Sequence, residues 1–190
     1  MPVISITLLP GYSPDVEQRL VSRVALAARS VIAAPDAGTT VFVNQASTYQ
    51  RDGRVHRSGG PACADASALV LAFLDLMQAR DLAAAERFLA PGFSMTFPGG
   101  VVMQQLTQLV GWAAGRYQSV AKTYAQFDEC WTPGGATVYC AGTLSGVWLD
   151  GTDFSGIRFI DRFEVAGGLL VRQDVWNDLA EAHPPSSAKA

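Results

Sequence analysis

The sequence predicts an α+β protein made of two successive parts, a short βαβ unit and a larger α+β domain with a curved antiparallel sheet. Three observations lead to this prediction. A strand-like, a helix-like and a second strand-like segment follow one another before residue 60. Helical periodicity then covers much of residues 66–116, and four long strand-like segments separated by turns fill residues 119–177. Helices followed by a strand meander are typical of α+β domains.

Composition indicates a folded protein and excludes some partners. Of the 190 residues, 49% are hydrophobic and 16% are charged, so the chain can bury a sizeable core. A net charge of -3 provides no basic field for nucleic acid or anionic lipid. No apolar run approaches the roughly 20 residues of a membrane span, and Met1–Leu9 lacks the features of a secretion signal. We expect a cytoplasmic protein with no nucleic-acid or membrane partner.

The sequence contains no pattern for a metal or nucleotide cofactor. Cys63, Cys130 and Cys140 show no CxxC spacing, and reduced, packed cysteines are the expectation. The two histidines, His56 and His183, are far apart, so neither a metal site nor a Ser/His/Asp grouping is indicated. The GxGxxG, GxxxxGK[ST] and GxSxG motifs are absent. We expect a small-molecule substrate and no cofactor.

The first part, residues 1–60, reads as strand, helix, strand and hairpin. Val3–Leu9 is rich in β-branched and aliphatic residues, and Thr40–Asn44 repeats this pattern. Ser13 is a good N-cap for a helix that continues to about Ala33. A helix between two such strands predicts a right-handed βαβ unit with parallel strands. Tyr49–His56 carries Asp52-Gly53, a common hairpin turn, and a linker follows over Arg57–Pro61.

Pro2 is the first candidate catalytic residue. If Met1 is removed, its nitrogen becomes a free secondary amine, and α-amino groups titrate at roughly 7.7–8.0. The alternative is that Met-Pro is simply a common way to begin a chain. A single βαβ unit also exposes both sheet edges and buries too little to be stable alone. We therefore expect a homo-oligomer.

Residues 2–60 resemble the 4-oxalocrotonate tautomerase family through the opening PVISITLLPGYSPDVEQRL, the segment APDAGTTVFVNQ and the hairpin that ends in Gly59-Gly60. The resemblance implies that Pro2 is a general base that moves a proton between carbons of an enol or dienol acid. Tyr12 and Thr40 stand where the family carries two substrate-binding arginines, which argues against the family's oxo-diacid substrate. Tyr12 is then a candidate substrate-binding residue. Arg51, Arg54 and Arg57 either supply a cation or form a solvated edge.

The second part, residues 64–183, begins with helices and ends with strands. Apolar spacing predicts helices over Ala66–Ala79, Leu82–Leu89 and Gln104–Arg116, with a short strand over Phe93–Phe97. Four strands follow at the positions Ser119–Thr132, Ala136–Leu149, Phe154–Val165 and Leu169–Asn177. Residues 184–190 read as a flexible tail.

Two aspartates are candidate acid/base residues. Alternation places Asp161 between Phe159 and Phe163 on one strand face, and Asp174 on one face with Arg172 and Trp176. A buried carboxylate must be paired or carry a raised pKa. Proton transfer is one interpretation, and the other is pairing across adjacent strands with one of three arginines, Arg158, Arg162 or Arg172.

Aromatic residues and one cation mark a candidate substrate pocket. Trp112, Arg116 and Tyr117 end the third predicted helix, where they either line a small-molecule site, with Arg116 binding an anion, or form core and a helix-end charge. Trp176 is a further candidate substrate-binding residue. Tyr124, Trp131 and Trp148 read as sheet packing.

Residues 64–180 resemble the nuclear transport factor 2-like fold in its polyketide cyclase-like and ketosteroid isomerase-like branch, through RFIDRFEV, the glycine turn and LLVRQDVWND. The resemblance implies an α+β cone and an acid/base role for an Asp at the place of Asp174. Together the two parts predict a cofactor-independent isomerase with Pro2 as base and a second pocket in the cone. The alternatives are a non-catalytic binding protein whose βαβ unit only oligomerises, and a cyclase or dehydratase acting through the cone alone.

Overall fold

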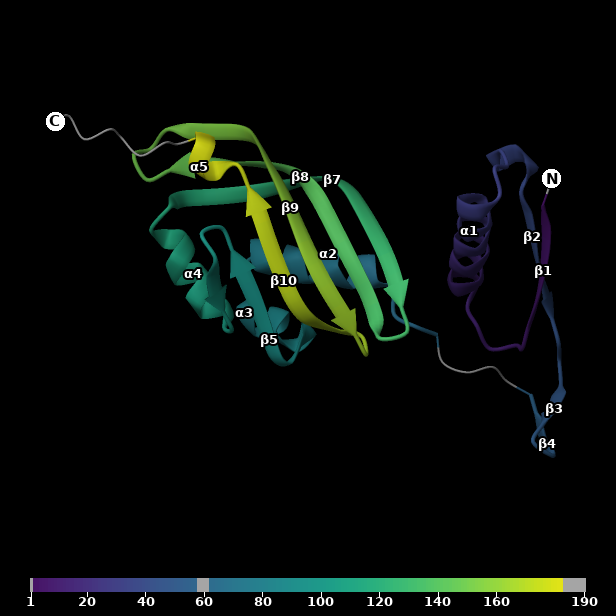
Figure 1. The fold of residues 1–190 in the computed structure, drawn as a ribbon. Coiled ribbons are helices and arrows are strands. Elements are labelled where there is room, and N and C mark those ends of the chain that lie inside the picture. Colours follow the sequence, from purple (N-terminus) through teal and green to yellow (C-terminus); the bar gives the residue numbers. More distant parts are fainter. Residues whose placement is uncertain (1, 58–61, 183–190) are drawn as a thin grey trace. The chain divides into compact units, whose positions relative to one another are not determined.

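The structure, a computed structural model, describes residues 2–57 and 62–182. The chain divides between Cys63 and Ala64 into two compact units, here called unit 1 and unit 2, which are drawn in Figure 1. Residues 58–61 of the predicted linker and the predicted tail from residue 183 lie outside the described residues. Each unit is described by itself below.

Unit 1 is a helix between two parallel strands. β1 (Val3–Leu8) pairs in parallel with β2 (Thr40–Gln45), and α1 (Pro14–Val31) connects them through a short 3-10 turn, η1 (Asp36–Gly38). The Ser13 hydroxyl accepts a hydrogen bond from the Val16 backbone N–H at 3.4 Å, so Ser13 is the N-cap that the sequence predicts. The hairpin of β3 (Tyr49–Arg51) and β4 (Arg54–His56) turns at the predicted Asp52-Gly53 pair.

Unit 1 buries little of its apolar surface. Ile4, Ile6 and Leu8 alternate with more exposed residues along β1, and no residue of α1 is buried. On the other face of this sheet, Val3 is 65% exposed and Phe42 is 54% exposed. A two-stranded sheet with one helix has too little interior to cover these side chains.

The main difference between the predicted and the observed helices of unit 2 is the C-terminal end of the second helix. α2 (Ala66–Gln78) and α4 (Leu106–Ala114) lie within the predicted ranges, and a short α5 (Leu179–Ala182) follows the last strand. The predicted helix Leu82–Leu89 is too long, because α3 (Leu82–Ala85) passes into the 3-10 turn η2 (Glu86–Phe88) and a strand begins at Leu89. The Asp81 carboxylate caps α3 by accepting from the Ala84 N–H at 3.0 Å.

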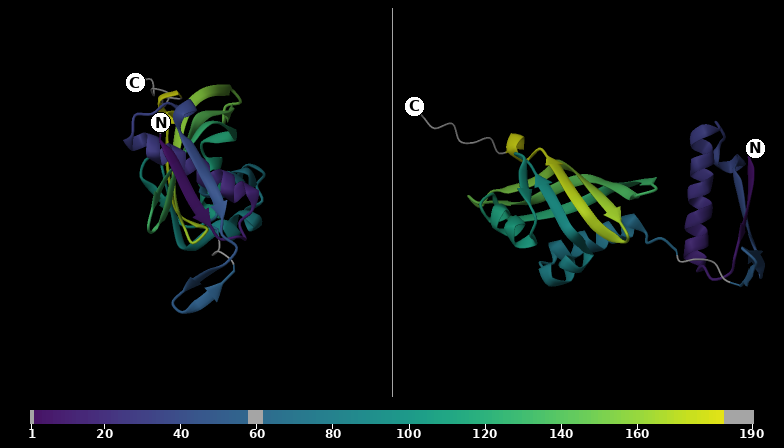
Figure 2. Two further views of the ribbon diagram at one scale, coloured as in Figure 1. Left: turned by 90° about the vertical axis from the view of Figure 1, so that its right-hand side faces the viewer. Right: turned by 60° about the horizontal axis from the view of Figure 1, so that its bottom comes forward.

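A curved six-stranded sheet forms the rest of unit 2, in the order β6-β5-β10-β9-β8-β7. Figures 1 and 2 show its long strands side by side and curving over α2. The prediction of a wholly antiparallel sheet is wrong for one pair, because β10 and β5 run parallel. The six strands are β5 (Leu89–Phe97), β6 (Val101–Met103), β7 (Tyr117–Thr132), β8 (Gly135–Trp148), β9 (Asp153–Ala166) and β10 (Leu169–Asn177).

Bulges give this sheet its curvature. Between Leu89 and Ser94 of β5, the pairing advances by only two residues on β10, so the Pro91-Gly92 segment forms a bulge inside the strand. Pro is tolerated there because a bulged residue does not donate to the ladder. Further register shifts occur between β7 and β8 and between β8 and β9, and bulges increase local twist and bending.

The core of unit 2 lies between the concave face of this sheet and the helices. α2 contributes Val70 and Phe73, which pack with Phe163 of β9 and Val138 of β8, and the Phe73 and Phe163 rings meet edge to face at 6.1 Å. Within residues 2–57 and 62–182, none of the helices has both the length and the apolar character needed to cross a bilayer.

Candidate functional site

A pocket opens beside α2, within the concave side of the unit 2 sheet, with a volume of about 110 Å³. Its lining is largely apolar and aromatic, with two cationic side chains and no carboxylate. Small-molecule sites are usually apolar hollows with a few convergent polar groups. The lining residues are Phe73, Leu74, Met77, Gln78, Arg80, Phe97, Leu109, Ala113, Tyr117, Val120, Lys122, Tyr124 and Gln173.

Asp161 lies directly behind two of these lining residues, Lys122 and Gln173, and contacts both. Its side chain is fully buried, and its Oδ2 atom forms an ion pair with Lys122 Nζ and accepts a hydrogen bond from Gln173 Nε2 at 3.3 Å. Its Oδ1 atom is buried and has no hydrogen-bond partner among the described residues. A buried carboxylate oxygen without a partner is costly, and such groups concentrate at functional sites.

Strand alternation produces this arrangement. On β9, Phe159, Asp161 and Phe163 are all buried, as the period of two predicts. Lys122 comes from β7, two strands away, and its Nζ lies 4.5 Å from the centre of the Phe159 ring. Gln173 comes from β10 on the other side of β9. Three strands of the sheet therefore bring a carboxylate, an ammonium group and an amide together.

Burial keeps the thiol and phenol groups near Asp161 neutral. Burial raises the pKa of the Cys140 thiol to about 12, and the negative charge of Asp161 acts in the same direction. Burial also raises the pKa of Tyr124, and the charges of Cys140 and Asp161 add to this effect. Tyr117 likewise has a raised pKa because of burial. The two tyrosines thus present neutral hydroxyl donors to the pocket at physiological pH.

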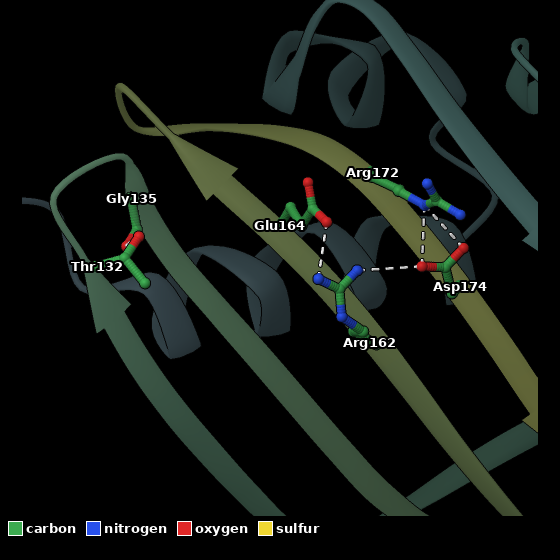
Figure 3. A network of polar contacts seen from close by, with 6 residues as sticks. All are labelled: Thr132, Gly135, Arg162, Glu164, Arg172 and Asp174. Atoms are coloured by element: carbon green, nitrogen blue, oxygen red, sulfur yellow. Dashed lines mark hydrogen bonds and ion pairs between the residues drawn. The ribbon is translucent and has the colours of Figure 1, made fainter.

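Asp174 lies on the opposite face of the sheet and not in the pocket. Its carboxylate accepts from Arg162 Nη1 at 3.1 Å and from Arg172 Nε at 2.9 Å, and Arg162 also pairs with Glu164 at 2.7 Å (Figure 3). This is the pairing alternative that the sequence left open for Asp174. Asp161 is also paired with a cation, but the predicted partner is wrong. The cation is Lys122 and not Arg158, Arg162 or Arg172.

Of the four candidate substrate-binding residues of unit 2, only one lines the pocket. Tyr117 lines the pocket. The Arg116 guanidinium stacks 3.9 Å from the Trp112 ring, and Trp112 meets the pocket residue Phe97 edge to face at 5.2 Å. Neither residue lines the pocket: Trp112 contacts a lining residue, and Arg116 is exposed. Trp176 is 52% exposed on the strand face that carries Asp174, away from the pocket.

Unit 1 holds the remaining predicted site residues. Pro2 is half-buried, and its carbonyl accepts a hydrogen bond from the Thr40 backbone N–H at 3.1 Å, so it is fixed at the start of β1. Tyr12 is half-buried in the loop before α1. Arg51 and Arg54 are exposed in the hairpin, as expected for a solvated edge. In the part of the chain that the structure describes, no three metal-ligating side chains cluster together.

Sequence reasoning missed four polar residues of the pocket, Gln78, Arg80, Lys122 and Gln173. It also assigned Tyr124 to sheet packing, whereas Tyr124 lines the pocket. The alternation of Val120, Lys122 and Tyr124 along β7 was a usable signal, since all three line the pocket. For Arg80, which follows α2, no comparable periodic signal exists.

Unit 2 is a small α+β cone with a pocket on its concave side. No model of a protein family matches the sequence, and no curated protein matches it. Solved structures match its fold. An NTF2-like protein of unknown function from Burkholderia pseudomallei K96243 aligns with a TM-score of 0.54 and 17% identity, over 64% of this chain and 97% of that chain.

Two further structures support the same fold. A candidate SnoaL-like polyketide cyclase from Jannaschia sp. CCS1 aligns with a TM-score of 0.52 and 16% identity, over 69% of this chain and 100% of that chain. TerC, co-crystallised with polyporic acid, aligns with a TM-score of 0.52 and 16% identity, over 62% of this chain and 94% of that chain. The chain thus shares the NTF2-like fold of these structures over about 60% of its length. The tautomerase resemblance of unit 1 stays a prediction.

Proposed function

We propose that unit 2 is a small-molecule isomerase or cyclase that works by proton transfer at the Lys122–Asp161 pair. One observation supports this proposal above the others: Asp161 is fully buried behind the pocket wall, ion-paired through Oδ2, and unpartnered at Oδ1 among the described residues. Known NTF2-like folds serve several functions, so the proposal rests on this site and not on the fold.

The residues suggest a division of roles. Lys122 balances the charge of the Asp161 carboxylate through their ion pair. Asp161 does not itself line the pocket, so it would take a proton from a carbon next to a carbonyl group through one bridging water, and return it by the same route to another carbon of the same molecule. The ammonium group of Lys122 and the neutral hydroxyls of Tyr117 and Tyr124 would stabilise the negative charge on the enolate oxygen. Gln173 holds the carboxylate in place.

Exchange of a substrate proton for deuterium tests this proposal whatever product the reaction forms. The full protein is incubated in D₂O with a panel of small aryl ketones and 2-oxo acids, and loss of the α-proton signal is followed by NMR. Removing a general base typically costs about 10²–10⁴-fold in rate, so Asp161→Asn should lose nearly all catalysed exchange. Asp174→Asn removes a carboxylate from the opposite face and discriminates between the two aspartates.

The outcomes show which aspartate, if either, carries out the proton transfer. Exchange lost in Asp161→Asn alone supports the proposal. Exchange lost in Asp174→Asn alone returns the acid/base role to Asp174. Equal exchange in the wild type and both variants contradicts the proposal. Binding of panel members without any exchange favours the alternative, a non-catalytic binding protein.

A second candidate function, tautomerase activity at Pro2, is supported by one observation. The Pro2 carbonyl is held by the Thr40 N–H, which fixes the proline at the beginning of the parallel sheet. Intact mass first establishes whether Met1 is removed, because a retained Met1 makes the Pro2 nitrogen an amide without basicity. Ketonisation of phenylenolpyruvate is then compared in the wild type, Pro2→Ala and Asp161→Asn. Loss confined to Pro2→Ala supports this second function.

A further inference from the structure

Arg80 occupies a backbone position that normally favours glycine. It follows the last turn of α2 with φ +62°, in the left-handed region. Its N–H donates to the Met77 carbonyl at 3.2 Å, and the Asp81 N–H donates to the Leu76 carbonyl at 3.0 Å. These two bonds form a Schellman motif, whose left-handed residue is usually Gly. A residue with a β-carbon is disfavoured there relative to Gly.

Helix termination alone therefore does not explain why this position carries an arginine and not a glycine. Strained backbone positions occur preferentially at functional sites. Here the Arg80 side chain lines the pocket, together with Lys122. The charges of Arg80 and Arg116 both act to lower the pKa of Tyr117, against the larger effect of burial, so both guanidinium groups lie within electrostatic reach of this pocket tyrosine.

The two cations of the pocket differ in how their charge is balanced. Lys122 is neutralised by its ion pair with Asp161. Within residues 2–57 and 62–182, the Arg80 side chain has neither a hydrogen bond nor an ion pair, and no Asp or Glu lines the pocket. Arg80, which is exposed to solvent, thus presents an unpaired guanidinium group at the edge of an apolar hollow. A guanidinium group matches the planar, two-oxygen geometry of a carboxylate.

We infer that the pocket binds a small aromatic or unsaturated carboxylate, with Arg80 holding the carboxylate group and the apolar wall holding the ring. Phe73, Phe97 and Leu109 provide that wall, and the volume of about 110 Å³ suits a single-ring compound. This inference deepens the proposed function, on which it rests for the pocket being the substrate site. It assigns the substrate class: a 2-oxo acid or other unsaturated acid, in preference to a neutral ketone.

Binding of benzoate and benzamide to the full protein tests the inference directly. The two probes share size and shape and differ in charge. Titration calorimetry should show benzoate binding at least tenfold more tightly than benzamide to the wild type. Arg80→Gln should abolish this preference, and Arg80→Lys should keep part of it, because the charge remains while the two-pronged geometry is lost. Arg87→Gln is the matched control, since Arg87 is exposed and does not line the pocket.

The outcomes separate this inference from the proposed function. Asp161→Asn should lose deuterium exchange and still prefer benzoate, because it leaves Arg80 unchanged. A benzoate preference without exchange in the wild type supports the inference and contradicts the proposed function. Equal binding of both probes, no benzoate binding at millimolar concentrations, or a preference that survives in Arg80→Gln or disappears in Arg87→Gln would overturn the inference.

Discussion

The ammonium group of Lys122 on β7 forms an ion pair with the buried carboxylate of Asp161 on β9, across the strand β8 that lies between them. The Asp161 side chain is 0% exposed and the Lys122 side chain is 23% exposed, so the pair is largely withdrawn from water. Its energetics differ from those of a surface pair, because removing one partner leaves the other charge buried without compensation.

Lys122→Met should destabilise unit 2 by about 3 kcal/mol, at the lower end of the range for breaking a buried pair because Lys122 is partly exposed. Urea unfolding at neutral pH measures the loss. Arg158→Met, which breaks the exposed pair with Asp178, is the control and should cost under about 1 kcal/mol. Similar losses in the two variants would show that the Lys122–Asp161 pair behaves as a surface pair.

The buried thiol of Cys140 should make stability depend on alkaline pH. Its pKa in the folded protein is about 12, against an ordinary value of 9.0. A raised pKa gives stability that is fully present below the unfolded value and is lost as pH rises toward the folded value. Between pH 8 and 10 the wild type should therefore lose about 1.4 kcal/mol more than Cys140→Ala. Urea unfolding of both proteins at these two pH values checks the difference, and parallel losses contradict it.

Arg80→Gly should stabilise the protein by about 0.5–1 kcal/mol, because glycine adopts the left-handed conformation without the strain of a β-carbon. Arg80→Ala also removes the charge but keeps the β-carbon, and its stability should stay close to that of the wild type. Thermal unfolding of the three proteins separates strain from charge. An Arg80→Gly variant no more stable than Arg80→Ala would show that position 80 is unstrained.

The exposed face of unit 1, defined by Val3 and Phe42, should be covered in the homo-oligomer that we propose. Phe42→Asp places a charge on this face and should shift the protein toward the monomer in sedimentation velocity. Val102→Asp changes an equally apolar, 65% exposed residue of unit 2 and should leave the assembly unchanged. A wild type that sediments as a monomer, or equal effects of both variants, contradicts this use of the face.

Local patterns predicted most elements of unit 2 but missed two kinds of feature. The long strands were placed to within about two residues, because alternation and Gly-containing turns are local signals. The parallel pairing of β5 with β10 and the bulge at Pro91-Gly92 were not predicted, since strand partnership depends on residues distant in sequence. Likewise the helix from Leu82 was predicted too long, because its apolar spacing continues smoothly into β5.

By itself, the sequence determined that Asp161 faces the core between two phenylalanines, because side chains alternate along a strand whatever its neighbours are. Only the tertiary structure decided that Lys122 neutralises this carboxylate and that Asp174 pairs with arginines on the far face. The order of strands and the bulges in β7, β9 and β10 set which side chains meet, and these depend on the packing of the whole sheet. The same packing brings Arg80, at the end of a helix, to the pocket that three strands and two helices enclose.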